Sequence, residues 1–122
     1  MRDPINAFSV LVVEDEFLIA MDLKRDLERA GYTVIGPTAT VTSALLMLDA
    51  HAPDACVLDV NLRGEHSHAV ATKLKAQNIP FILSSAYHSG DLTHSAFKGV
   101  ENLGKPAPTD KLLAFLQVLL AR

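Results

Sequence analysis

The chain has 122 residues, of which 49% are hydrophobic and 20% are charged. This balance is typical of a folded, soluble domain and unlike a disordered chain, and the length fits one domain. The net charge of −3 and the scatter of the basic residues argue against a nucleic-acid surface, which needs clustered lysines and arginines.

The sequence also limits the cellular compartment. Its single cysteine, Cys56, cannot form an internal disulfide, which favours a reducing environment. No apolar run is long enough to cross a bilayer, and the N-terminal residues lack the basic-then-apolar order of a signal peptide. We therefore expect a cytoplasmic protein that does not interact with membranes.

Short apolar runs alternate along the chain with longer segments that have the spacing of an amphipathic helix. We expect five strands, at residues 8–13, 33–36, 55–58 and 80–85 and within 99–103. We expect helices in the segments 14–31, 42–51, 64–78 and 106–121, and a short one within 88–98. This alternation predicts an α/β fold, in which a parallel sheet carries helices on both faces.

Polar side chains lie at or just after the carboxyl ends of four of the expected strands. They are Glu14 and Asp15 after the first strand, Asp59 after the third, Ser85 in the fourth and Lys105 after the fifth. In such a sheet ligands bind beyond the carboxyl ends of the strands, so we expect these side chains to converge. Three acids in one place repel one another unless a cation is present, and oxygen ligands of this kind suit Mg²⁺.

Phosphoryl transfer to a carboxylate is the chemistry that fits this set of groups. Asp59 would be the nucleophile and would form an acyl phosphate. The metal ion and Lys105 would neutralise charge on the phosphoryl oxygens, and the Ser85 hydroxyl would donate a hydrogen bond to one of them. The protein would contribute mainly position and charge.

Four short motifs, VLVVEDE, VLDVNLRG, FILSSA and GKP, occur in this order along the chain. Together they resemble the receiver domain of two-component response regulators. The resemblance spans residues 1–122 as one domain. It implies a doubly wound, flavodoxin-like sheet of five parallel strands in the order 2-1-3-4-5, with about five helices, the fourth of them short or mobile.

The resemblance implies a role for each matching residue of the acidic group. Asp59 matches the phosphoacceptor, which is also a metal ligand, and Asp15 matches the direct metal ligand. Glu14 matches the acid that acts on the metal through water, and the backbone carbonyl of Asn61 matches the third protein ligand. The implied ion is Mg²⁺, with Mn²⁺ as an alternative.

The remaining site residues include departures from the family pattern. Ser85 matches the serine or threonine switch, and Lys105 matches the invariant lysine. Many receivers place an aromatic residue three positions before this lysine, whereas Asn102 stands here, which puts the usual aromatic switch in doubt. The segment PFILSSAY is similar to that of stand-alone alphaproteobacterial receivers, where Tyr87 would take over part of the signalling role. The family ties the lifetime of the acyl phosphate to the positions of Asn61 and Tyr87.

A signalling switch, rather than a metabolic enzyme, is the function that the resemblance implies. The chain would be a single-domain response regulator that receives its phosphoryl group from a histidine kinase or a histidine phosphotransfer protein and then binds a downstream protein. Because the sequence ends at Arg122, just after the last expected helix, we expect no attached output domain. The outward face of that helix could serve a weak homodimer or a kinase.

Two other functions stay open at this point. A phosphatase of the haloacid dehalogenase type also uses a strand-end aspartate and Mg²⁺, but such enzymes place a second aspartate two residues later, where this chain has Asn61. A degenerate receiver could act only as a protein-interaction scaffold. The intact acids argue against the scaffold, and Asn102 is the departure that leaves room for it.

Overall fold

The structure, a computed structural model, describes residues 8–86 and 94–121. Its central sheet has the strand order β2-β1-β3-β6, and all three pairings are parallel. The strands are β1 (Ser9–Val13), β2 (Thr33–Thr38), β3 (Ala55–Leu58) and β6 (Phe81–Leu83). This order matches the first four strands of the predicted sheet.

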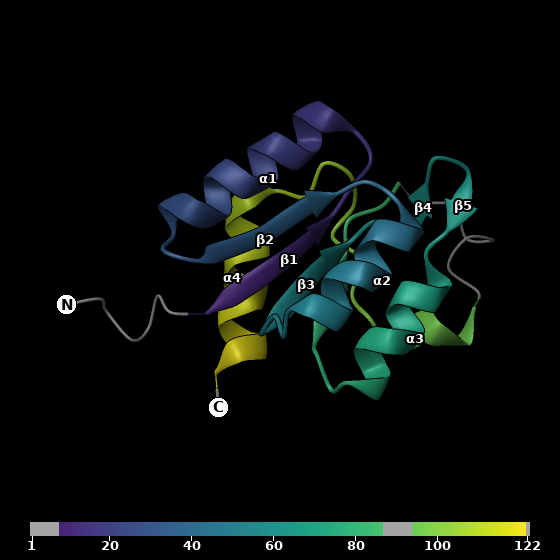
Figure 1. Ribbon diagram of the computed structural model, residues 1–122. Helices are drawn as coiled ribbons and strands as arrows, with labels where there is room; N and C mark the ends of the chain where they lie inside the picture. The colour runs from purple at the N-terminus through teal and green to yellow at the C-terminus, as the bar shows by residue number, and fades with distance from the viewer. Residues whose placement is uncertain (1–7, 87–93, 122) are drawn as a thin grey trace.

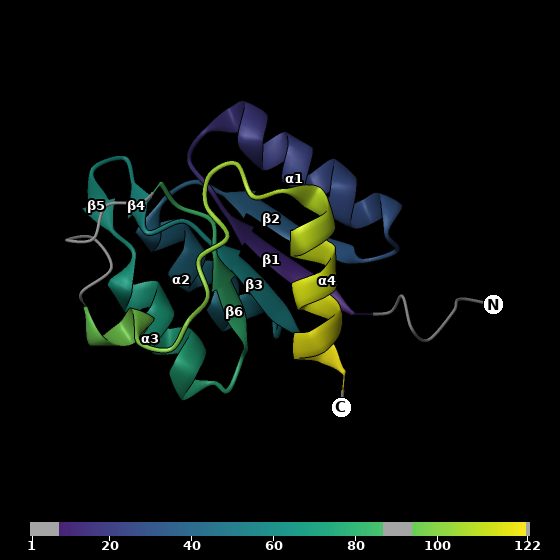
Figure 2. The same cartoon turned by 180° about the vertical axis from the view of Figure 1, so that it is seen from behind.

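Among the described residues, four α-helices cover the two faces of this sheet (Figures 1 and 2). On one face lie α2 (Val41–Ala50) and α3 (His68–Ala76), and on the other lie α1 (Phe17–Arg29) and α4 (Thr109–Leu120). The predicted α/β fold with helices on both faces is thereby confirmed. No helix within the described ranges has the length and apolar character needed to span a bilayer.

Two hydrophobic layers arise because successive residues of a strand point to opposite faces. In β1, Leu11 and Val13 pack with buried residues of α2 and α3. Val10 and Val12 pack instead with buried residues of α1 and α4. The continuous apolar run of β1 is therefore explained by burial of the strand on both sides.

A bulge interrupts the pairing of β1 with β2 next to the expected site. Gly36 in β2 has a φ of +91°. A Cβ added there would lie 2.9 Å from the backbone nitrogen of Thr38 and 3.0 Å from the carbonyl oxygen of Val12, so only glycine fits. The same bulge places the carbonyl of Thr38 where it accepts the backbone N–H of Glu14 at 2.9 Å.

A short antiparallel hairpin follows β3 and has no counterpart among the expected elements. It pairs β4 (Asn61–Leu62) with β5 (Glu65–His66) and lies beyond the carboxyl ends of the strands (Figure 1). Arg63 and Gly64 in its turn have φ values of 53° and 82°. Two positive φ values are those of a type I′ turn, which suits the twist of a hairpin. Its sequence signal, Arg-Gly, is weaker than the usual Asn-Gly.

The short helix expected within 88–98 appears as one 3₁₀ turn, η3 (Ser95–Phe97), in the described part of that segment. Its N-terminal cap is His94, whose Nδ1 accepts a hydrogen bond at 3.0 Å from the backbone N–H two residues later. The same imidazole stacks on His68 of α3, with the ring centroids 4.4 Å apart. These contacts hold η3 against α3.

The fifth strand expected within 99–103 is reduced to one parallel bridge between Leu83 and Asn102. Gly99 turns the chain with a φ of 77°, and the backbone N–H of Val100 donates at 3.1 Å to a carbonyl of η3. Because Gly99 and Val100 complete the turn after η3, these two residues do not extend the sheet. The described sheet therefore has four strands and a bridge instead of five strands.

Candidate functional site

Three acidic side chains gather at the carboxyl ends of β1 and β3. One carboxylate oxygen each from Glu14, Asp15 and Asp59 lies within 4.8 Å of the others. In the described part of the chain, no other group of three histidine, cysteine or acidic side chains comes this close. Glu14 and Asp59 are each 2% exposed. The structure thus brings together the three acids that the sequence places at strand ends.

The backbone of Asp59 is held on both sides of the residue. Its N–H donates to the carbonyl of Val13 at 3.0 Å, and its carbonyl accepts the hydroxyl of Ser67 at 2.6 Å. Ser67 is fully buried, and its own N–H donates to the carbonyl of Val60 at 2.8 Å. Sequence reasoning missed Ser67, because a lone serine eight residues after the aspartate belongs to no motif. Its role is to fix the position of Asp59.

Lys105 brings a positive charge into the acidic cluster. Its Nζ lies 2.6 Å from Oδ2 of Asp59, 2.9 Å from Oε2 of Glu14 and 3.7 Å from Oδ1 of Asp15. A fourth acid, Glu16, contacts the same nitrogen at 2.7 Å, and its side chain is 60% exposed. Glu16 was not a candidate from the sequence, although it directly follows Glu14 and Asp15, and this run of three acids could have pointed to it. It covers the Lys105 ammonium from the solvent side.

The pKa values of the buried groups follow from this crowding. The pKa of Glu14 is raised to about 7, chiefly by burial and also by the charge of Asp59. Hydrogen bonds from the Glu16 N–H and from Lys105 act in the opposite direction and lower this pKa. Burial also raises the pKa of Asp59, against the hydrogen bond from Lys105. Burial alone would lower the pKa of Lys105, but its hydrogen bonds to the carboxylates raise it above the usual range. The cluster therefore holds a permanent cation among acids that burial makes harder to ionise.

Asp15 differs from the other two acids. Partial burial acts to raise its pKa, but the contacts that lower it prevail, the backbone N–H of Arg63 first among them. That N–H, at the tip of the hairpin, donates to Oδ2 of Asp15 at 3.0 Å. Asp15 is therefore ionised at neutral pH, and the hairpin holds one of its oxygens in place.

Unsatisfied oxygens in the cluster fit a divalent cation. Oε1 of Glu14 and Oδ1 of Asp15 are buried and have no hydrogen-bond partner in the described part of the structure. A buried polar atom without a partner is costly, and a hard cation that prefers oxygen ligands would remove that cost. The donor set of Glu14, Asp15 and Asp59 therefore fits Mg²⁺.

Asn61 lies beside the aspartate at the start of the hairpin. Its N–H donates to Oδ1 of Asp59 at 3.3 Å, and its side-chain oxygen accepts the N–H of Gly64 at 2.9 Å. The side chain thus stabilises the hairpin turn, while the backbone N–H contacts the carboxylate of Asp59. The expected role of the Asn61 carbonyl as a metal ligand stays a prediction.

Ser85 follows β6 and is buried at the edge of the site. Its N–H donates to Oδ1 of Asn102 at 3.2 Å, and the same oxygen accepts the N–H of Gly104 at 3.0 Å. Asn102, which the sequence marks only as a departure, therefore links the segment of Ser85 to the residue before Lys105. The switch role of Ser85 stays a prediction, and Tyr87 lies outside the described residues.

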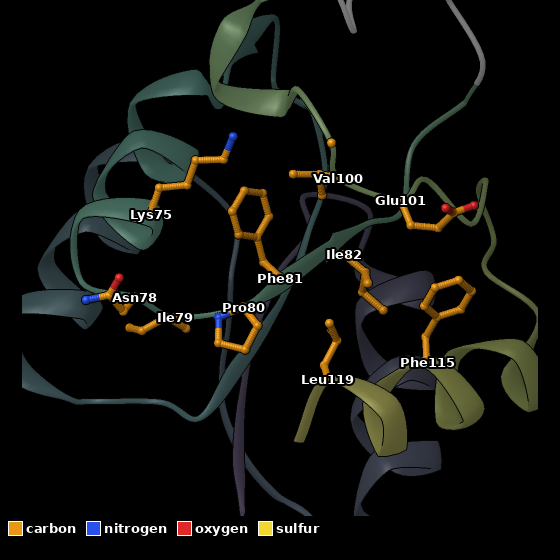
Figure 3. Close-up of a pocket in the computed structure, with 11 residues that line it drawn as sticks. Lys75, Asn78, Ile79, Pro80, Phe81, Ile82, Val100, Glu101, Phe115 and Leu119 are labelled. Atoms are coloured by element: carbon orange, nitrogen blue, oxygen red, sulfur yellow. The ribbon is translucent and has the colours of Figure 1, made fainter. Parts of the chain in front are cut away.

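An apolar pocket of about 560 Å³ lies at the open edge of β6, and Glu14, Asp15 and Asp59 are not among its lining residues (Figure 3). There Ile82 points toward Phe115 and Leu119 of α4, whereas Phe81 points to the other side, toward Lys75. Val100 and Glu101, which lead into the bridge at Asn102, also line the pocket. Its lining has no part in the acidic cluster.

Comparison with known proteins agrees with this geometry. The sequence profile of the response regulator receiver domain matches residues 10–117. The solution structure of SdrG from Sphingomonas melonis Fr1 is 40% identical, with a TM-score of 0.79, and the match covers 94% of this chain and 98% of that one. A BeF₃-activated conformation of SdrG is 38% identical, with a TM-score of 0.75, and the match covers 92% and 95% of the two chains.

Curated relatives are longer than this chain. The transcriptional regulatory protein PdtaR of Mycobacterium tuberculosis is 28% identical over 116 residues, which are 93% of this chain and 57% of PdtaR. The phyllosphere-induced regulator PhyR of Methylorubrum extorquens is 37% identical over 90 residues, which are 71% of this chain and 34% of PhyR. The chain therefore spans about half of one and a third of the other.

Proposed function

Because the chain belongs to the response regulator receiver domain family, we propose that its Asp59 accepts a phosphoryl group from a histidine kinase or a histidine phosphotransfer protein. The observation that carries the proposal is the buried carboxylate of Asp59, which lies 2.6 Å from the Lys105 ammonium and within the same cluster as two further acids. A receiver domain is a signalling switch, so the product is a phosphorylated protein with altered partner binding. The phosphatase alternative finds no support in the family match or in the residue at position 61.

Phosphoryl transfer would proceed by attack of an Asp59 carboxylate oxygen on the phosphorus of a phosphohistidine. The phosphorus–nitrogen bond breaks, a phosphorus–oxygen bond forms, and the electron pair of the broken bond stays on the imidazole of the donor. Lys105, already beside Oδ2 of Asp59, would neutralise charge on a phosphoryl oxygen as it arrives. The carboxylate would thus react where its counter-charge is preorganised.

A divalent ion completes this arrangement. When bound, Mg²⁺ supplies neutralising charge to the carboxylates and the phosphoryl oxygens together. Glu14, Asp15 and Asp59 would hold it, and the Asn61 carbonyl would be a further ligand. Mn²⁺ has the same preference for oxygen ligands and would be the substitute.

Intact-mass measurement tests the proposal directly. The protein is incubated with acetyl phosphate and Mg²⁺, and we expect the mass gain of one phosphoryl group. The gain should vanish in Asp59→Asn and with a chelator, because the nucleophile or the cation is then missing. The matched control, Asp49→Asn on the exposed surface of α2, should be labelled like the wild type. Labelling that persists in Asp59→Asn would refute the assignment of the phosphoacceptor.

Apolar side chains next to the site favour a protein as the phosphoryl donor. Phe17 and Leu18, in the first turn of α1, are 73% and 76% exposed and follow the acids of the cluster directly. Met21, one turn further, is also exposed. Neighbouring exposed apolar residues are typical of interaction surfaces. A kinase or phosphotransfer protein that reaches Asp59 would cover this part of α1.

Substitution of both Phe17 and Leu18 by alanine is expected to slow transfer from the partner kinase by ~10-fold or more. Labelling by acetyl phosphate should stay unchanged, because the two side chains would contact the donor protein and not the carboxylate. Leu46→Ala, at an exposed leucine of α2, is the control and should change neither rate. If labelling by acetyl phosphate slowed equally, the patch would act on the site itself and not on the donor.

A further inference from the structure

Asn102 stands where two segments of the site meet. Its Oδ1 accepts the backbone N–H of Ser85 at 3.2 Å and that of Gly104 at 3.0 Å. Ser85 is the predicted switch residue, and Gly104 directly precedes Lys105. One side-chain oxygen therefore joins the backbone of the switch segment to the backbone that carries the lysine.

A second side chain holds Gly104 from its other end. The hydroxyl of the buried Ser84 donates to the carbonyl of Gly104 at 3.2 Å. Among the described residues, backbone pairing here is limited to the bridge at Asn102, where Leu83 donates to the carbonyl of Glu101 at 2.8 Å and accepts the N–H of Leu103 at 2.9 Å. Beyond Leu103, the side chains of Ser84 and Asn102 hold Gly104 and so help to set the path of the chain into Lys105.

We propose that Asn102 is a positioning residue that couples displacement of Ser85 to displacement of Lys105. The inference rests on the proposed function, because the displacement begins with a phosphoryl group on Asp59. If Ser85 moves toward that group, its N–H must either leave Oδ1 of Asn102 or draw the side chain with it. The N–H of Gly104 donates to the same oxygen, so its hydrogen bond changes in both cases. In the first case the oxygen loses a competing donor, and in the second the oxygen itself moves.

This coupling differs in kind from one that uses an aromatic ring. A ring transmits movement by packing into or out of a space, whereas the carboxamide of Asn102 transmits it through two directed hydrogen bonds. Such bonds weaken steeply as their distance and angle depart from the optimum. A small movement of the Ser85 peptide is therefore enough to alter the bond to Gly104.

Amide hydrogen exchange of the wild-type protein tests the coupling. Exchange at Ser85 and Gly104 is followed by NMR before and after beryllofluoride and Mg²⁺ are added as a phosphoryl mimic. We expect both rates to change together. A change in the exchange rate of Ser85 without a change in that of Gly104 would overturn the inference. Binding of the mimic is monitored separately by its fluorine signal, and loss of that signal would refute the proposed function instead.

Two variants separate coupling from a general structural role. Asn102→Leu keeps the size of the side chain without an acceptor, and we expect Ser85 to respond alone. Asn102→Asp keeps an acceptor oxygen, and we expect it to restore the joint response. Glu101→Gln, at the exposed neighbouring position, is the matched control and should behave as the wild type. A joint response in Asn102→Leu would overturn the inference; if that variant does not fold, the wild-type exchange rates decide.

Discussion

Replacement of Lys105 by methionine is expected to lower the free energy of unfolding by about 3 kcal/mol near neutral pH. The ammonium lies 2.6 Å from Asp59 and 2.9 Å from Glu14, both of which are buried. Methionine keeps much of the side-chain length but leaves these carboxylates without a counter-charge. Removal of one partner of a buried ion pair is costly for this reason.

The loss of stability should depend on pH and on metal. Glu14 is protonated below its pKa of about 7 and ionised above it, so the effect of Lys105→Met should grow as the pH rises through that value. Added Mg²⁺ should stabilise the variant more than the wild type, because it replaces the missing charge. Urea denaturation with and without Mg²⁺ measures both effects.

Lys111→Met, at an exposed lysine of α4, provides the matched control for this experiment. A surface substitution of this kind is expected to change the unfolding free energy by no more than about 0.5 kcal/mol. Equal stability of the two variants would show that the Lys105 ammonium does not compensate the acids.

Replacement of Gly36 by alanine is expected to cost about 3 kcal/mol. The positive φ contributes about 1 kcal/mol, and overlap of the new Cβ with backbone atoms contributes roughly 2 kcal/mol more. The atoms that it would meet belong to the backbone of Thr38 and Val12, so no side-chain rotation relieves the contact. Because Thr38 accepts the N–H of Glu14, the shift should also reach the acidic cluster.

Gly99→Ala separates the two causes. Gly99 also has a positive φ, of 77°, but a Cβ there would meet no atom of the described residues within 4 Å. We expect it to lose about 1 kcal/mol, from backbone strain alone. Denaturant unfolding of both variants makes the comparison, and equal losses would contradict the account of the bulge at Gly36.

The layered fold could be predicted from the hydrophobic periodicity of the sequence. The run 8–13 is apolar at every position but Ser9, which predicts a strand buried on both faces, and the helical segments repeat at the spacing of an amphipathic helix. The hairpin at 61–66 is not predictable in this way, because strands of two residues have no period to detect. The segment 99–103 looks like a strand, but its pairing is limited by the turn at Gly99, which depends on η3.

The acids and the lysine of the site are predictable because each lies at the end of a strand. The contacts that arrange them are not, since they join residues that are far apart in the chain or outside any motif. Ser67 contacts the carbonyl of Asp59 only because the hairpin brings it back. From the sequence, Asn102 is recognised only because it stands where many receivers have an aromatic residue. The two hydrogen bonds that its side chain accepts can be seen only in the structure.

The fixed backbone of Asp59 has a consequence for the direction in which a signal travels. Its N–H is bonded to β1, and its carbonyl is bonded to the buried Ser67 hydroxyl at 2.6 Å. A residue anchored on both sides cannot recoil when a bulky dianion is attached to it. The accommodation would then fall on the segments around Ser85 and Lys105, so that the conformational response would run outward to the β6 edge of the sheet.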